Sequence, residues 1–255
     1  MVHHICLIGN SHLAGMRRAW PTIKEQFSQF QVTFFGGPGK TIADVELSDG
    51  LLSATTPRAA HLLNKVSGRT EIVLGDYNAF CVVGSGLRPS AAVDLIGEFS
   101  TRRSSGRRLI SPEVFAAAVE GTLDHSVAMR LARLVRGVSQ APLFLIPQPW
   151  PMAGILDEKN DERLASAAQR CGAALGEAST VAAGFSQAMY GLAKLIDGAT
   201  LPQPEFTIER EILTANRFRY FQDGERKDYA HANEEFGAAT LKTVFSALTQ
   251  TPVGR

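Results

Sequence analysis

The chain has 255 residues, of which 45% are hydrophobic, so it is long enough for one well-buried α/β domain or two small ones. Its 26 basic residues nearly balance 25 acidic ones, which gives no reason to expect a nucleic acid or a membrane surface as a partner. The first residues do not resemble a signal peptide, and no apolar run approaches the roughly 20 residues of a membrane helix. Three scattered cysteines lead us to expect a reduced, cytoplasmic protein, and the His and Cys residues are not spaced as metal ligands.

Short apolar runs alternate with helical patterns along the chain. Residues 5–8 form the first expected strand, and residues 13–20 an amphipathic helix that we expect Pro21 to end. Further strands are expected at residues 31–35, 79–83 and 143–146. Further helices are expected at residues 112–136, 161–176, 179–196 and 233–248. Strands that alternate with helices predict a three-layer α/β/α sandwich around a mainly parallel sheet, with a ligand crevice at the carboxyl ends of the strands.

We expect one domain over residues 1–255, with an insertion of helices and a basic loop at about 88–140. The least regular part is 88–111, where Arg102, Arg103, Arg107 and Arg108 surround Ser104-Ser105-Gly106. A basic lid over an anionic substrate is one interpretation of this segment. We favour the other, a solvated loop.

The first glycine turn, Gly9-Asn10-Ser11-His12-Leu13-Ala14, follows a strand and opens a helix, which is the setting of a dinucleotide-binding loop. Ser11 occupies the position where that loop needs a glycine for close approach of the pyrophosphate. Leu13 likewise replaces the last glycine of the nucleophile elbow of α/β-hydrolases. Both interpretations are therefore weak.

A second turn contains Gly39-Lys40-Thr41 and superficially resembles a phosphate-binding loop. Phe34 stands where such a loop has its first glycine, and Pro38 removes a backbone N–H that would contact phosphate. An ATPase is therefore not favoured.

A serine nucleophile fits the first turn better. Ser11 lies between a strand and a helix, where its hydroxyl can reach the crevice and the helix N-terminus favours an anion. Far downstream, Asp228 and His231 are three residues apart, close enough for the carboxylate to orient the imidazole. Each residue alone could be a helix cap or a surface residue. Their joint placement favours catalysis.

At these residues the sequence resembles the SGNH/GDSL hydrolase superfamily along its whole length. Gly9-Asn10-Ser11 is similar to the family's G-D-S block, and Asp228 and His231 match its D-x-x-H block. The variant Gly-Asn-Ser-His resembles the turn of carbohydrate acyl-ester enzymes and O-acyltransferases of the same clan. The resemblance implies a five-stranded, flavodoxin-like sheet. It also implies an oxyanion-hole glycine at Gly36, with Gly37 as the near alternative.

The family's third block, G-x-N, is incomplete in this chain. The segment reads Gly84-Ser85-Gly86, so no asparagine is available to donate to the oxyanion. Either Ser85, a backbone N–H of Ser85 or Gly86, or a residue from elsewhere in the chain replaces it, or the enzyme is slow. Asn78 precedes the expected strand and lies too far from the crevice to be assigned.

The resemblance implies a Ser11–His231–Asp228 esterase with an acyl-enzyme intermediate, acting on a small acyl ester such as an O-acetylated sugar. Such a mechanism needs no metal or organic cofactor. Its oxyanion donors would come from Ser11, Gly36 and Ser85. Four further residues are candidates for substrate binding: His12, Gly37, Gly86 and Trp150, the last by stacking on a sugar ring. An O-acyltransferase, or a non-catalytic domain that binds a carbohydrate or a partner, remains open as an alternative. The oligomeric state is not predicted.

Overall fold

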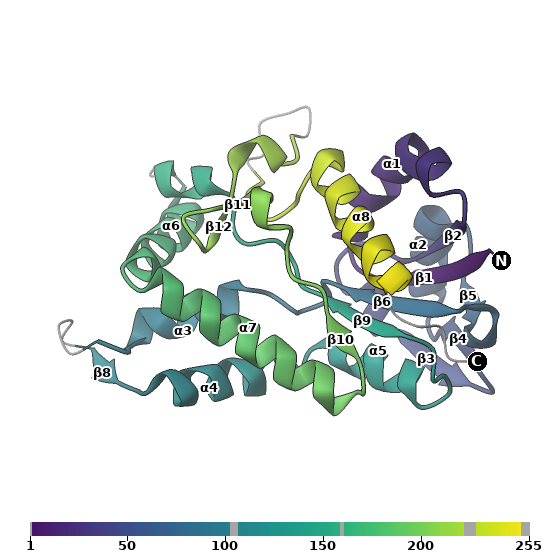
Figure 1. Cartoon of the computed structure of the whole chain (residues 1–255), viewed down its shortest axis with the longest axis horizontal. Coiled ribbons are helices and arrows are strands. Elements are labelled where there is room, and N and C mark those ends of the chain that lie inside the picture. Colours follow the sequence, from purple (N-terminus) through teal and green to yellow (C-terminus); the bar gives the residue numbers. More distant parts are fainter. Residues whose placement is uncertain (1, 103–106, 159–160, 222–227, 251–255) are drawn as a thin grey trace.

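The computed structural model describes residues 2–102, 107–158, 161–221 and 228–250. Its centre is a parallel sheet of five strands in the order β10-β9-β6-β1-β2 (Figure 1). In chain order these strands are β1 (His3–Gly9), β2 (Phe30–Gly36), β6 (Ala79–Val83), β9 (Leu143–Ile146) and β10 (Ala199–Thr200). Helices flank both faces. The expected three-layer, flavodoxin-like α/β fold is therefore confirmed.

Both faces of the sheet are buried because its strands are apolar at successive positions. Ile5 and Leu7 of β1 pack into a core with α1 (Leu13–Ile23) and α8 (Glu234–Gln250). Cys6 and Ile8 point to the opposite face, whose core includes side chains of α2 (Pro57–Ser67) and α5 (Val127–Arg136). All four strand residues are fully buried, as expected for a strand covered on both sides.

Four more helices pack on one another beyond β9 and β10, at the left of Figure 1. α4 lies against α7, and α3 lies against α6. Their bounds are α3 (Ser90–Glu98), α4 (Pro112–Asp124), α6 (Glu162–Leu175) and α7 (Ala178–Leu195). The expected helical region 112–136 is thus two helices, α4 and α5. The second begins where the Ser126 hydroxyl accepts a hydrogen bond from the N–H of Met129 at 3.3 Å.

The end expected for α1 at Pro21 is wrong. The helix continues to Ile23, and Pro21 lies inside its last turn. A proline removes one backbone hydrogen bond and crowds the carbonyl four residues earlier. Ile23 is buried in the core between the sheet and α8, and this burial offsets the loss.

Three small sheets were not expected from the sequence. One is an antiparallel sheet of β3 (Val45–Ser48), β4 (Leu51–Ala54) and β5 (Glu71–Val73). The other two pair β7 (Phe99–Ser100) with β8 (Arg108–Leu109), and β11 (Ile208–Glu209) with β12 (Leu213–Thr214). β3 and β4 are joined by Asp49-Gly50, whose φ angles of 50° and 80° suit a tight hairpin turn.

Candidate active site

The turn between β1 and α1 holds Ser11 at the carboxyl edge of the sheet. The carbonyl of Asn10 accepts a hydrogen bond from the N–H of Leu13 at 3.0 Å, and that of Ser11 accepts from Ala14 at 3.0 Å. These bonds lead into α1, which begins two residues after the serine. The hydroxyl therefore sits at the N-terminus of a helix, where the helix dipole stabilises negative charge.

α1 and α8 cross at two glycines, and this crossing brings the distant ends of the chain together. A Cβ atom on Gly237 would lie only 2.3 Å from the carbonyl carbon of Gly15. A Cβ atom on Gly15 would in turn lie 2.7 Å from the carbonyl oxygen of Asn233. Since no side chain separates the two backbones, the segment that precedes α8 can lie across the start of α1.

His231 of that segment meets Ser11. The Oγ atom of Ser11 lies 2.7 Å from Nε2 of His231, and Nδ1 of His231 lies 2.7 Å from Oδ2 of Asp228. An ionised carboxylate can only accept, so Nδ1 carries the proton and Nε2 is free to accept from the serine hydroxyl. This is the hydrogen-bonded order of a nucleophile, a general base and a group that orients the base.

Asp228 is held as a carboxylate by its own loop. Its Oδ1 atom accepts hydrogen bonds from the N–H of Ala230 at 2.9 Å and from that of His231 at 3.0 Å. Burial raises the pKa of Asp228, but these two N–H groups and the His231 ring outweigh it, so its pKa lies below the usual range. The orienting group therefore stays charged at neutral pH.

The ring of His12 stacks on the ring of His231. Their centroids are 4.8 Å apart and their planes differ by 22°. Burial, reinforced by the charge of His231, lowers the pKa of His12 to about 3. His12 is therefore neutral at physiological pH, and its ring contacts the ring of His231.

The backbone N–H of Gly36, which we expected to bind the oxyanion, is already engaged. It donates to Oγ of Ser67 at 2.9 Å, and the same hydroxyl donates to the carbonyl of Gly36 at 2.8 Å. The expected role of Gly36 in the oxyanion hole is therefore corrected, because its N–H already donates a hydrogen bond within the fold. Gly37, the alternative, directly follows the end of β2 and packs against Thr41.

The Ser85 hydroxyl is engaged as well. It donates to the carbonyl of Val83 at 3.2 Å, so it is turned toward its own strand and away from the role we expected. Ser85 has a φ of 47°, a conformation that side chains rarely adopt. Gly84 before it leaves room for Asn10 and His12, since a Cβ there would lie 2.7 Å from Oδ1 of Asn10. Gly86 packs against Ser126, at the start of α5.

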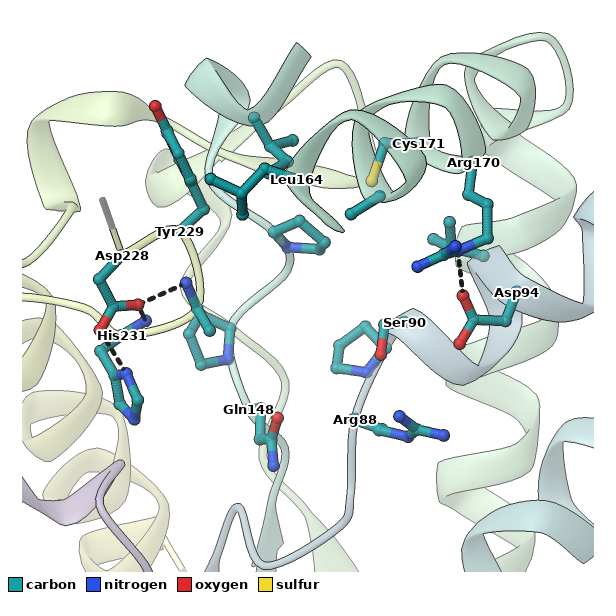
Figure 2. Close-up of a pocket in the computed structure, with 17 residues that line it drawn as sticks. Arg88, Ser90, Asp94, Gln148, Leu164, Arg170, Cys171, Asp228, Tyr229 and His231 are labelled. Atoms are coloured by element: carbon teal, nitrogen blue, oxygen red, sulfur yellow. Dashed lines mark hydrogen bonds and ion pairs between the residues drawn. The ribbon is translucent and has the colours of Figure 1, made fainter. Parts of the chain in front are cut away.

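A cavity of about 480 Å³ opens beside His231, a size suited to a small molecule (Figure 2). It extends from the Asp228–His231 loop towards α3 and α6. One part of the wall is apolar and includes Val93, Ile155, Leu164 and Ala167. The polar part includes Arg88, Ser90, Asp94, Gln148 and Arg170.

Trp150 does not offer a face for a sugar ring. Its side chain is 5% exposed and packs edge-on against Phe185, with ring centroids 5.3 Å apart. Its neighbours Pro149 and Pro151 line the cavity, but Trp150 does not. The expected stacking role is therefore corrected to one of packing.

The described part of the basic segment is not a lid over this cavity. Arg107 forms an ion pair with the buried Glu177 at 2.9 Å. Ser100 and the N–H of Thr101 donate to the same carboxylate at 2.7 and 2.8 Å. Arg102, Arg107 and Arg108, the described arginines of this segment, do not line the cavity. Arg103 and residues 104–106 lie outside the described residues.

Sequence reasoning missed Ser67, Arg88 and the role of Gln148 in the cavity wall. Gln148 and Arg88 both follow core strands, β9 and β6, at the edge where we placed the crevice. Their place after these strands was the signal in the sequence that could have identified them as cavity residues. Ser67 had none, because it acts from the end of α2 on a residue 31 positions earlier.

The described ranges contain neither a candidate metal site nor a candidate membrane span. No three His, Cys, Asp or Glu side chains gather there in a way that could hold a metal ion. None of the helices in those ranges is both long and apolar enough to cross a membrane.

Comparisons with known proteins give only distant structural likenesses. No family model and no curated protein matches the chain. The periplasmic domain of a lipopolysaccharide acetyltransferase from Salmonella ser. Paratyphi A is similar at 10% identity and a TM-score of 0.43, over 98% of this chain and 85% of that one. A DUF4886 family protein from Bacteroides uniformis is similar at 12% identity and a TM-score of 0.44, over 99% and 85%. We draw no functional argument from either.

Proposed function

We propose that the protein is a serine-dependent carboxyl-ester hydrolase of the SGNH type that acts on a small acyl ester. The observation that carries the proposal is the continuous pair of 2.7 Å contacts from Ser11 through His231 to Asp228. Each atom in this chain of contacts is the one that acyl transfer requires.

In the first step, Nε2 of His231 takes the proton of Ser11 while Oγ attacks the ester carbonyl. The charge that develops on the imidazole is stabilised by the Asp228 carboxylate. When the tetrahedral intermediate collapses, His231 gives its proton to the departing alcohol and the acyl group stays on Ser11. A water molecule, deprotonated by His231 in turn, then releases the acid and restores the serine.

The oxyanion would be bound mainly by backbone groups. The N–H of Ser11 at the start of α1 is the first donor we propose, and the N–H of Gly37 replaces that of Gly36 as the second. No asparagine follows β6, and the Ser85 hydroxyl is engaged with Val83. Loss of one such donor typically costs about a hundred- to thousandfold in turnover, so we expect a slow esterase.

The test is hydrolysis of short aryl esters by the wild type and by Ser11→Ala. We expect the variant to retain less than about a thousandth of the wild-type kcat, because no other group in the chain of contacts can take the acyl group. Equal rates would remove the serine mechanism and leave a non-catalytic binding domain as the better interpretation. A Ser11→Cys variant, which keeps a nucleophile, checks that loss of activity reflects chemistry and not misfolding.

An O-acyltransferase with the same residues is the second candidate. It is favoured by the cavity beside His231, which has room for an acceptor alcohol next to the base that would activate it. Product analysis with an aryl acetate and an added sugar or polyol separates the two activities. A transferase would pass most acyl groups to the added alcohol at millimolar concentration, whereas a hydrolase would release acetate.

A further inference from the structure

The charged side chains that line the cavity are unequally partnered. Asp228 is paired with His231, and Asp94 forms an ion pair with Arg170 at 2.8 Å. Arg88 is the remaining charge. Among the described residues, no carboxylate lies within ion-pair distance of Arg88, and its guanidinium makes no hydrogen bond. The cavity wall thus contains one cation whose charge is not balanced by a neighbouring carboxylate.

Two neutral donors accompany Arg88 in the cavity wall. The N–H of Gln148 donates to the carbonyl of Leu87 at 2.8 Å, which joins the segments that follow β9 and β6 and brings Gln148 close to Arg88 in the fold. Ser90 begins α3 two residues further along. Neither the Gln148 amide nor the Ser90 hydroxyl has a hydrogen-bond partner within the described part of the chain. Figure 2 shows the three side chains at the cavity wall.

The cavity lies on the side where an alcohol would leave. Its wall includes His231 and Asp228 but neither Ser11 nor Gly37, the residues that we propose to bind the acyl carbonyl. In the proposed mechanism His231 protonates the departing oxygen, so the alcohol portion of the ester must project from Ser11 past His231. That portion would then occupy this cavity.

We propose that the substrate is an ester whose alcohol portion carries an anionic oxygen group, a carboxylate or a phosphate, bound by Arg88. A guanidinium binds either group through paired N–H donors, and Gln148 and Ser90 can supply the further hydrogen bonds. The apolar residues of the wall would contact the carbon skeleton of the alcohol. This inference rests on the proposed function, since it identifies the substrate class of the same site.

The kinetic test compares 3-acetoxybenzoate with its neutral isostere 3-acetoxybenzamide, which differ in charge but scarcely in shape. We expect the wild type to favour the benzoate in kcat/KM by about tenfold or more, and Arg88→Gln to abolish that preference. Arg88→Lys should keep part of it. Arg58→Gln, which removes an exposed arginine of α2 outside the cavity, is the matched control and should change the preference less than about twofold. An unchanged preference in Arg88→Gln would overturn the proposal.

A binding test separates this inference from the proposed hydrolysis. The Ser11→Ala variant, with and without Arg88→Gln, is titrated calorimetrically with 3-hydroxybenzoate, 3-hydroxyphenyl phosphate and 3-hydroxybenzamide. We expect at least one anion to bind about tenfold more tightly than the amide, only when Arg88 is present. The tighter anion identifies the preferred group. Equal binding of all three would overturn the inference even if Ser11 proves catalytic, and failed hydrolysis with Arg88-dependent anion binding would overturn only the esterase.

Discussion

The Oγ atom of Ser11 lies 2.7 Å from Nε2 of His231, although 220 residues separate them along the chain. Ser11 lies just before α1, and His231 lies just before α8. These two helices cross where Gly15 and Gly237 pack backbone against backbone. The geometry of the site therefore depends on a contact that Ser11, Asp228 and His231 do not themselves make.

Replacing Gly237 by alanine tests this dependence. Its Cβ would lie 2.3 Å from the backbone of Gly15, so α8 must shift and carry the His231 segment with it. We expect a loss of about 1–3 kcal/mol in unfolding free energy and a disproportionate fall in kcat on aryl esters. Gly121→Ala in α4 is the control, because a Cβ there meets nothing within 4 Å. It should leave kcat unchanged and slightly raise the stability. Unaltered activity in Gly237→Ala would contradict this account of how the site is assembled.

Asp228→Asn should separate the electrostatic role of Asp228 from its role in ordering the loop. An asparagine can still accept the N–H groups of Ala230 and His231, so the thermal midpoint should change little. It cannot stabilise the imidazolium, and its amide favours the wrong tautomer of His231. We expect kcat to fall by about 10³- to 10⁴-fold. A fall of less than tenfold would mean that Asp228 has only a structural role.

His12 should make stability depend on pH. Its pKa is lowered from 6.5 to about 3 in the folded protein, so below pH 6.5 the unfolded chain binds a proton that the folded chain does not. Stability contributed by neutral His12 is complete above pH 6.5 and is lost as the pH falls towards 3, by at most about 1.4 kcal/mol per pH unit. His12→Phe keeps an aromatic ring against His231 but cannot titrate. Chemical denaturation between pH 7 and 4.5 should show a shallower loss for this variant, and parallel curves would contradict a lowered pKa of His12 in the folded protein.

Glu177 should matter for stability alone. Its buried carboxylate accepts hydrogen bonds from Ser100 and Thr101 and pairs with Arg107. In Glu177→Gln one of these donors meets an amide NH₂ group, and Arg107 loses its partner. We expect a loss of about 1–3 kcal/mol in unfolding free energy with kcat within about twofold of the wild type. A large fall in kcat would show that this segment contributes to the site after all.

Much of the central sheet could be predicted because both faces of its strands are buried. The strands at 79–83 and 143–146 have the bounds expected from their continuous apolar runs. β10 was not located, since a strand of two residues, Ala199 and Thr200, gives no pattern of its own. The β3–β4 hairpin did carry a signal, Asp49-Gly50 between apolar residues, that our interpretation did not use.

In the site, the roles of side chains could be predicted from the sequence, whereas the roles of backbone groups could not. Ser11, Asp228 and His231 could be selected because their side-chain chemistry is visible in the sequence. A sequence does not show which backbone N–H groups are already hydrogen-bonded, so the hydrogen bond from Gly36 to Ser67 could not be predicted. Asn78 was set aside correctly, because its amide oxygen accepts from the N–H of His4 at the opposite end of the sheet. The predicted sugar-stacking role of Trp150 was wrong because a sequence does not show whether an aromatic ring is buried against its neighbours.

The most direct test of the serine mechanism is covalent labelling of the folded protein with a fluorophosphonate, read by intact mass and peptide mapping. The account predicts one adduct per chain, located on Ser11, absent in Ser11→Ala and at least about a hundredfold slower in His231→Ala. A folded protein that takes up no label on Ser11, or that labels equally fast without His231, would contradict it.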